Sequence, residues 1–172
     1  FDVEEYPTHG GSLRVFAQRS DAGQHPTNTR VKKLLELESQ AGVNTADYYL
    51  GFQAIVNQVK DDLITFLLDI KHQGKTVAGY GAAAKGNTLL NYSGIRPDLM
   101  PYVVDRNPFK QGKYLPGSRI PITTENRIKE EKPDYILILP WNIKDEVISQ
   151  LAYVRKWGGK FVTAVPELEI KD

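Results

Sequence analysis

The 172-residue sequence predicts an α/β fold in which a parallel sheet carries helices on both faces. From Thr76 onward, short and nearly continuous apolar runs alternate with helical segments, a rhythm typical of parallel strands buried on both sides. The first run leads directly into the segment Gly79–Tyr92, which is typical of a strand that enters a glycine turn and then a helix. With right-handed crossovers, these observations predict a Rossmann-like sheet of about five strands, preceded by an extended arm and two helices.

Residues 1–43 are expected to form the arm and the first helix. A proline and a Gly-Gly pair interrupt the start of the chain, and residues 12–18 then alternate apolar and polar side chains as strands do. After a polar loop, residues 30–40 carry leucines at helical spacing, and Gly42 ends the pattern.

Residues 44–74 are expected to form one long helix that connects two structural units. Asn44 or Thr45 can cap it, and apolar residues recur at intervals of three and four positions before Gly74. Residues 75–172 are expected to form the α/β domain. Its predicted strands contain, in order, the runs TVAGYG, PYVVD, SRIPI, YILILP and KFVTAV.

Composition excludes several classes of function. The formal net charge of +1, with both signs mixed along the chain, gives no reason to expect a nucleic acid or an anionic membrane surface as partner. The absence of cysteine excludes disulfides and thiolate zinc sites, and because the three histidines are far apart in sequence, no metal site is expected. No stretch approaches the roughly 20 apolar residues of a membrane span, and we expect a cytoplasmic protein. Because the chain starts at Phe1 rather than at a methionine, we expect a fragment of a longer polypeptide or a processed form.

The spacing Gly79-x-Gly81-x-x-Ala84 fits the dinucleotide-binding fingerprint in its Gly/Gly/Ala form. In this interpretation Gly79 permits the tight turn, Gly81 lets backbone amides approach a phosphate, and Ala84 lets the helix lie close to the strand. The N-terminus of that helix attracts an anion, and Lys85 and Asn87 add polar side chains there. The alternative is that the small residues are present only because strand and helix pack closely.

Polar residues also follow the next strands. Asp105 suits either a hydrogen bond to a ribose or a structural role in a turn. Arg106 opens a loop rich in Lys, Arg, Gly and Pro that suits phosphate binding or simple exposure to solvent. Trp141 and Asn142 follow the strand YILILP, where open parallel sheets bind ligands, so that Trp141 is suited to stack on a base or sugar or to pack in an interior.

The arm carries the densest cluster of reactive side chains, in the segment EYPTHGGSLR. His9 can take or give a proton near neutral pH, while Tyr6 and Arg14 can stabilise a developing negative charge. Gly10 and Gly11 leave the backbone open to a substrate. Ser12 completes the cluster. The alternative is a turn histidine that faces solvent.

The chain resembles the C-terminal domain of the nucleotide-sugar C-methyltransferases, which place a methyl group on a carbon of a keto-deoxysugar. The resemblance covers essentially the whole chain and rests on the segments HGGSLR, GYGAAAKGNTLLNY, VVDRNPFKQGKYLPGSRIPI, ILPWN and YVRKWGGKFV. It implies that His9 removes the proton next to the ketone, with Tyr6 nearby, and that the enolate attacks the methyl group of S-adenosylmethionine. Thr8 stands where relatives carry an acidic residue just before the histidine.

The resemblance also implies partners. The substrate would be a nucleotide-diphosphate sugar anchored by the glycine turn, while zinc and S-adenosylmethionine would be bound by preceding domains of the same polypeptide. The residues alone leave two other functions open. One is an NAD(P)-binding domain of an oxidoreductase or nucleotide sensor, and the other is an interaction module that docks through its long helix.

Overall fold

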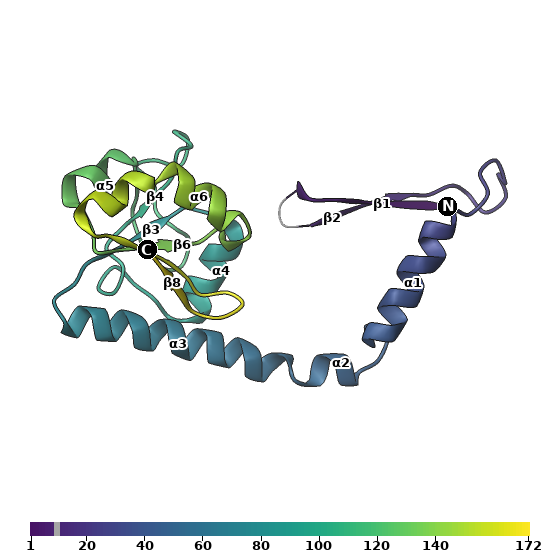
Figure 1. Ribbon diagram of the computed structural model, residues 1–172, viewed down its shortest axis with the longest axis horizontal. Helices are drawn as coiled ribbons and strands as arrows, with labels where there is room; N and C mark the ends of the chain where they lie inside the picture. The colour runs from purple at the N-terminus through teal and green to yellow at the C-terminus, as the bar shows by residue number, and fades with distance from the viewer. Residues whose placement is uncertain (9–10) are drawn as a thin grey trace. The chain divides into compact units, whose positions relative to one another are not determined.

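The computed structural model describes residues 1–8 and 11–172 (Figure 1). The chain divides into two compact units, Phe1–Ile55 and Val56–Asp172. The finer division at residues 43 and 74 stays a prediction.

The first unit begins with a two-stranded antiparallel sheet rather than a single extended arm. Strand β1 (Asp2–Tyr6) pairs with β2 (Ser12–Phe16), so that Glu4 lies opposite Arg14 and Tyr6 opposite Ser12. Strand β2 matches the predicted alternation. Strand β1 was not predicted, because it is mostly charged and only its Val3 is buried.

Helix α1 (Thr29–Ala41) follows as predicted. The Asn28 side chain caps it by accepting a hydrogen bond from the backbone N–H of Arg30, and Gly42 ends it in the left-handed conformation. The Arg30 guanidinium binds the Asp2 carboxylate through two hydrogen bonds, one of them 2.9 Å long from Nε. This ion pair fastens α1 to β1.

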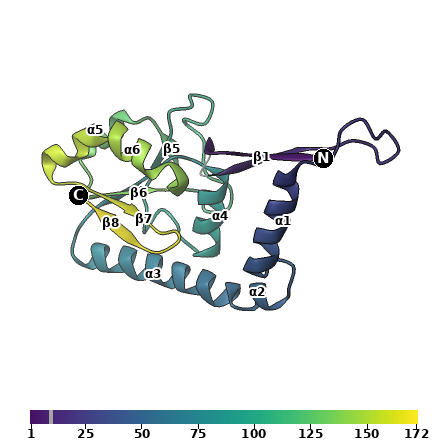
Figure 2. The same cartoon turned by 45° about the vertical axis from the view of Figure 1, so that its right-hand side comes forward.

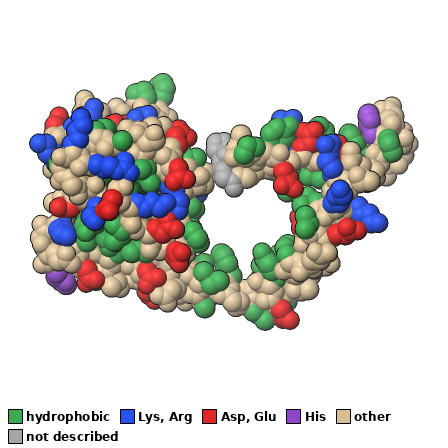
Figure 3. Space-filling view, viewed as in Figure 1, with side chains coloured by type: hydrophobic (Ala, Val, Ile, Leu, Met, Phe, Trp, Pro, Cys, Tyr) green, Lys and Arg blue, Asp and Glu red, His purple; other side chains and the backbone are tan. Residues whose placement is uncertain are grey.

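The single helix predicted over residues 44–74 was wrong. Two helices occupy this stretch, α2 (Asp47–Leu50) and α3 (Phe52–His72), and Gly51 separates them. Glycine is the physical reason, because it loses more backbone entropy in a helix than any other residue. Apolar side chains are exposed along α1, α2 and the first turn of α3, among them Leu35, Leu50 and Phe52 (Figure 3).

The second unit contains a six-stranded sheet in the order β5-β4-β3-β6-β7-β8. The strands are β3 (Val77–Tyr80), β4 (Val103–Val104), β5 (Ile122–Thr123), β6 (Tyr135–Ile138), β7 (Lys160–Thr163) and β8 (Glu169–Lys171). Strands β3 to β7 run parallel to the neighbours with which they pair, and β8 pairs antiparallel with β7. The α/β class with a mostly parallel sheet is confirmed, but the prediction of about five strands was one short. Strand β8 is a short, polar edge strand without an apolar run, so its pairing was not visible locally.

Helices cover both faces of this sheet (Figures 1 and 2). Helices α3 and α4 (Ala84–Tyr92) lie on one face, and α5 (Asn126–Glu131) and α6 (Lys144–Gln150) lie on the other. Short 3₁₀ helices, η2 (Trp141–Ile143) and η3 (Ala152–Trp157), flank α6.

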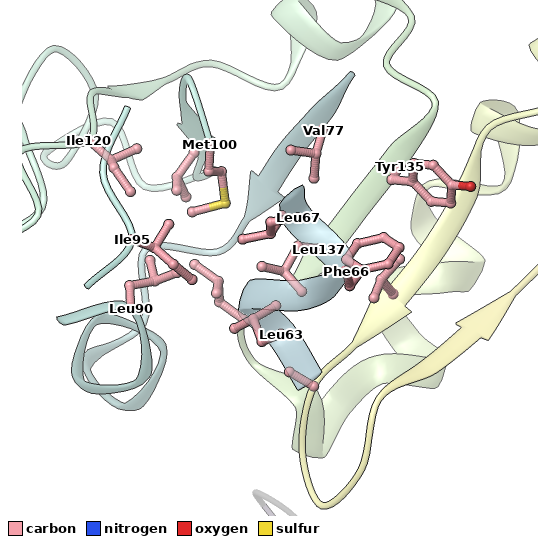
Figure 4. Close-up of a cluster of buried hydrophobic side chains, with 14 of the residues drawn as sticks. Leu63, Phe66, Leu67, Val77, Leu90, Ile95, Met100, Ile120, Tyr135 and Leu137 are labelled. Atoms are coloured by element: carbon pink, nitrogen blue, oxygen red, sulfur yellow. The ribbon is translucent and has the colours of Figure 1, made fainter. Parts of the chain in front are cut away.

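Strand β6 shows why its sequence reads as a continuous apolar run. Tyr135 and Leu137 join the core under α3 and α4 (Figure 4), whereas Ile136 and Ile138 join the core under α5 and α6. Each fully buried side chain of this kind contributes roughly 1.5–3 kcal/mol. A strand between two cores therefore needs apolar residues at every position. No helix among the described residues is long and apolar enough to cross a membrane.

Candidate functional site

The glycine turn lies where β3 ends and α4 begins, at the carboxyl edge of the parallel sheet. Gly81 makes the turn, with φ of +83°, and it lies against Pro140, whose Cδ would be 2.7 Å from a Cβ at position 81. Gly79, predicted to permit the tight turn, instead lies inside β3. A Cβ there would lie 2.8 Å from Cγ2 of Val103, so Gly79 serves the close approach of β4.

The close approach of helix to strand also depends on a different residue from the one predicted. Gly86, in the first turn of α4, would place a Cβ 2.6 Å from Cβ of Leu139. Ala84, predicted for this role, is the exposed first residue of α4. The fingerprint spacing correctly predicted a strand, a turn and a helix. The residues with the packing roles differ from those predicted, because Gly81 rather than Gly79 makes the turn and Gly86 rather than Ala84 lets the helix lie close to the strand.

Asp105 fastens the next loop to this turn. Its Oδ2 accepts hydrogen bonds from the backbone N–H of Ala82 at 2.8 Å and from Nζ of Lys110 at 3.0 Å, and its Oδ1 accepts from the backbone N–H of Asn107 at 2.8 Å. Lys110 Nζ also donates to the carbonyl of Ala82 at 2.9 Å. The Asp105 side chain is only 12% exposed. Its contacts are those of the turn role that the sequence left open beside the ribose role.

A pocket of about 710 Å³ opens beside the turn. One wall is the start of α4, including Ala82–Ala84 and Asn87, and the other is the loop Phe109–Pro116. The side chain of Asn91 ties the two walls together, because its Nδ2 donates to the carbonyl oxygens of Asn87 and Pro116, both at 2.9 Å.

The remaining predicted residues of this unit lie outside the lining of this pocket. Nζ of Lys85 lies 4.9 Å from the ring centroid of Trp141, which follows β6 together with Asn142. Arg106 forms a 2.8 Å ion pair with Glu125, at the start of α5. The Tyr153 hydroxyl donates to the same carboxylate. Burial is the main cause that raises the pKa of Tyr153, and this hydrogen bond raises it further. Asn87 is therefore the predicted site residue that lines the pocket.

Sequence reasoning missed the aromatic members of the lining. Phe109 and Tyr114 lie on the loop wall and are 81% and 64% exposed. The signal was present in the sequence, because Phe109 and Tyr114 flank Lys110 and Lys113 in a single loop.

In the first unit, Tyr6 lies in a chain of hydrogen bonds. Its hydroxyl donates to Oε2 of Glu4 at 2.7 Å and accepts from Nη1 of Arg14 at 2.6 Å. The hydrogen bond to Glu4 is the main cause that raises the pKa of Tyr6, so the phenol keeps its proton at neutral pH. Glu4 was not identified from the sequence, because only strand pairing places it beside Tyr6 and Arg14.

Two further members of the predicted catalytic cluster, Gly11 and Ser12, line a pocket of about 250 Å³ together with Tyr6. The Ser12 hydroxyl donates to the carbonyl oxygen of Thr8 at 2.9 Å. His9 and Gly10 lie outside the described residues. No group of three His, Asp or Glu side chains in the described part of the chain is arranged to hold a metal ion.

Comparison with known proteins identifies relatives. A family model described as the C-methyltransferase C-terminal domain matches residues 7–166. The chain is 36% identical over 166 residues to the C-methyltransferase NovU of Streptomyces niveus, an alignment that covers 96% of this chain. The same alignment spans 39% of the length of that relative.

Proposed function

Because the chain belongs to the C-methyltransferase C-terminal domain family, as the sequence resemblance predicted, we propose that it is the substrate-binding part of a C-methyltransferase. The substrate is a keto-deoxysugar linked to a nucleotide diphosphate, and the methyl donor is S-adenosylmethionine. The observation that carries the proposal is the pocket of about 710 Å³ at the carboxyl edge of the sheet, with cationic and aromatic side chains in its lining. Open α/β sheets bind their ligands at this edge.

The glycine turn helps to anchor the sugar nucleotide. Gly81 brings the backbone of residues 82–84 to the pocket wall, and the first turn of α4 has N–H groups without partners inside the helix. Asn87 adds an amide to the same wall. These groups suit an anionic ligand. Lys85 and Arg106 add positive charge near the sugar nucleotide from outside the pocket lining. Lys85 lies over the ring of Trp141, and Arg106 pairs with Glu125.

The chemistry belongs to the first unit. His9 takes the proton from the carbon next to the ketone, and the resulting enolate attacks the methyl carbon of the sulfonium. A C–C bond forms, the S–CH₃ bond breaks with its electron pair going to sulfur, and S-adenosylhomocysteine leaves. Tyr6, which keeps its proton at neutral pH, turns its hydroxyl hydrogen from Glu4 to the enolate oxygen, and Arg14 supplies positive charge beside it.

The methyl donor binds elsewhere in the polypeptide, on the domains for S-adenosylmethionine and zinc that the resemblance implies. Two observations support this placement. The relative NovU is more than twice as long as the matched region, and the Asp105 carboxylate, which would otherwise suit a ribose, is engaged by Ala82 and Lys110. We place the reaction in the cytoplasm, where nucleotide sugars are made.

The test is His9→Ala in the complete natural protein. The variant is expected to lose methyl transfer, and also to lose deuterium exchange at the carbon next to the ketone when S-adenosylmethionine is omitted, while it still binds S-adenosylmethionine. Exchange reports the proton-transfer step alone. The matched control is His25→Ala, because His25 stacks on Phe1 in the same unit and has no role in the proposal. Retained exchange in His9→Ala would remove His9 from the mechanism.

An NAD(P)-binding domain is the second candidate, favoured by the spacing of Gly79, Gly81 and Ala84 after β3. The engaged carboxylate of Asp105 argues against it. Quenching of tryptophan fluorescence by NADH, without a response to dTDP, would favour this candidate over the sugar nucleotide.

A further inference from the structure

The loop wall of the 710 Å³ pocket presents one uncommitted cation between two exposed rings. Lys110, the other cation of the pocket lining, is engaged by Asp105 and the carbonyl of Ala82, and Arg106, which follows Asp105 in the sequence, is engaged by Glu125. Within the described residues, the ammonium group of Lys113 makes no hydrogen bond or ion pair. Lys113 is therefore the lining cation whose charge is available to a ligand.

The backbone displays this wall in a defined shape. The Gly112 N–H donates to the Ile122 carbonyl at 2.9 Å, and the Ile122 N–H donates to the Lys113 carbonyl at 2.8 Å. Tyr114 forms an isolated antiparallel bridge with Pro121, and Leu115 is buried in the core. Lys113 and Tyr114 thus project from a hydrogen-bonded ribbon whose next residue is anchored, which lowers the entropy cost of ordering them around a ligand.

We propose that Phe109, Lys113 and Tyr114 form the subsite for the nucleoside diphosphate part of the substrate, an inference that rests on the proposed function. Lys113 pairs with the diphosphate, because an ammonium group is a strong point-charge donor to phosphate oxygens. Phe109 and Tyr114 stack against the base, because every base offers a flat π-face to an aromatic ring. The carboxylate of Asp105 takes no part, since it holds the loop in place through Lys110.

This assignment separates Lys110 from Lys113, although the two lysines lie in the same loop and line the same pocket. Lys110 is a positioning residue, because its ammonium group holds Asp105 and the Ala82 carbonyl. Lys113 is a ligand-binding residue.

Isothermal titration calorimetry on the 172-residue chain tests the subsite, with dTDP, thymidine and inorganic pyrophosphate as probes. Lys113→Ala is expected to weaken dTDP and pyrophosphate by about 10- to 100-fold, the usual effect of losing one charge-assisted contact, and to leave thymidine unchanged. Lys113→Arg should restore most of the binding. Tyr114→Ala and Phe109→Ala should weaken thymidine and dTDP but not pyrophosphate. Lys156→Ala, which removes the same charge at an exposed position outside the pocket lining, is the matched control.

Two calorimetric results would overturn the inference. One is wild-type affinity of Lys113→Ala for dTDP, and the other is absence of dTDP binding to the wild-type chain, because the subsite lies wholly within it. The proposed function fails by a different measurement, when the complete natural protein transfers no methyl group to any nucleotide-linked keto sugar. Methyl transfer with an unchanged KM in Lys113→Ala would sink the subsite and leave the function standing.

Discussion

Replacing Gly81 with alanine should destabilise the second unit more than the same replacement at Gly94. Both glycines have positive φ, +83° at Gly81 and +67° at Gly94. A Cβ at position 81 would lie 2.7 Å from Cδ and 2.9 Å from Cγ of Pro140, whereas a Cβ at position 94 would meet no atom within 4 Å. The pair therefore separates backbone strain from collision.

The magnitude follows from these two contributions. An alanine in the left-handed region costs roughly 1–2 kcal/mol, and this cost is common to both positions. Forcing a methyl group into a packed contact costs about 1–3 kcal/mol more, and only Gly81 has such a contact. We expect a loss in the free energy of unfolding of about 2–5 kcal/mol for Gly81→Ala and about 1–2 kcal/mol for Gly94→Ala.

Urea unfolding followed by tryptophan fluorescence measures the difference. Both tryptophans, Trp141 and Trp157, belong to the second unit, so the signal reports the unit that contains the mutations. Pro140→Ala supplies the double-mutant cycle, since it removes Cγ and Cδ and leaves Cβ at 3.9 Å from the new methyl group. The double variant should recover the collision cost of about 1–3 kcal/mol. Equal losses at Gly81 and Gly94, or no recovery with Pro140→Ala, would refute the account of this turn.

Three further outcomes are expected. Asp105→Asn should lower the free energy of unfolding by about 1–3 kcal/mol in the same assay, because an amide cannot accept on both sides as the carboxylate does; an unchanged midpoint would contradict this. The Arg30 hydrogen bond holds the pKa of Asp2 below its ordinary value of 3.8, so the stability from this pair is fully present above that pH and lost as the pH falls through the lower folded-state pKa. Carboxyl chemical shifts should show that pKa rising toward 3.8 in Arg30→Gln, and no change would show that Arg30 is not the cause. Glu4→Gln should lower the pKa of Tyr6 toward its ordinary value, and a titration of the Tyr6 ring signals by NMR measures this change. A pKa that stays as high as in the unmodified chain would contradict the assigned cause.

Local patterns predicted most of the secondary structure of this chain. The continuous apolar run of β6 and the helical spacing of α1 were both visible in the sequence, because burial on two faces or on one face dictates which positions must be apolar. The same patterns failed for β1 and β8. Both are short and polar, and they exist as strands because a partner strand satisfies their backbone groups.

The candidate site likewise has features that the sequence predicted and residue roles that it did not. The glycine turn was predicted from its spacing, Asn87 from its polar side chain just after that turn, and the cationic loop from its composition. The roles of individual residues were not accessible, because they depend on which side chain lies against which. Lys110 and Lys113 have the same chemistry in the sequence and line the same pocket, and only the tertiary structure shows that Lys110 is the one bound to Asp105.

By itself, the sequence determined the α/β class, the turn between β3 and α4, and the family to which the chain belongs, because these depend on local periodicity and ordered motifs. The tertiary structure alone decided that Gly81 rather than Gly79 makes the turn, that Gly86 rather than Ala84 admits the helix, and that Glu4 holds the Tyr6 hydroxyl. Each of these is a contact between groups brought together by strand pairing or by the packing of helix on sheet. Such contacts leave no periodic trace in the sequence, since the partner's position along the chain is set by the fold.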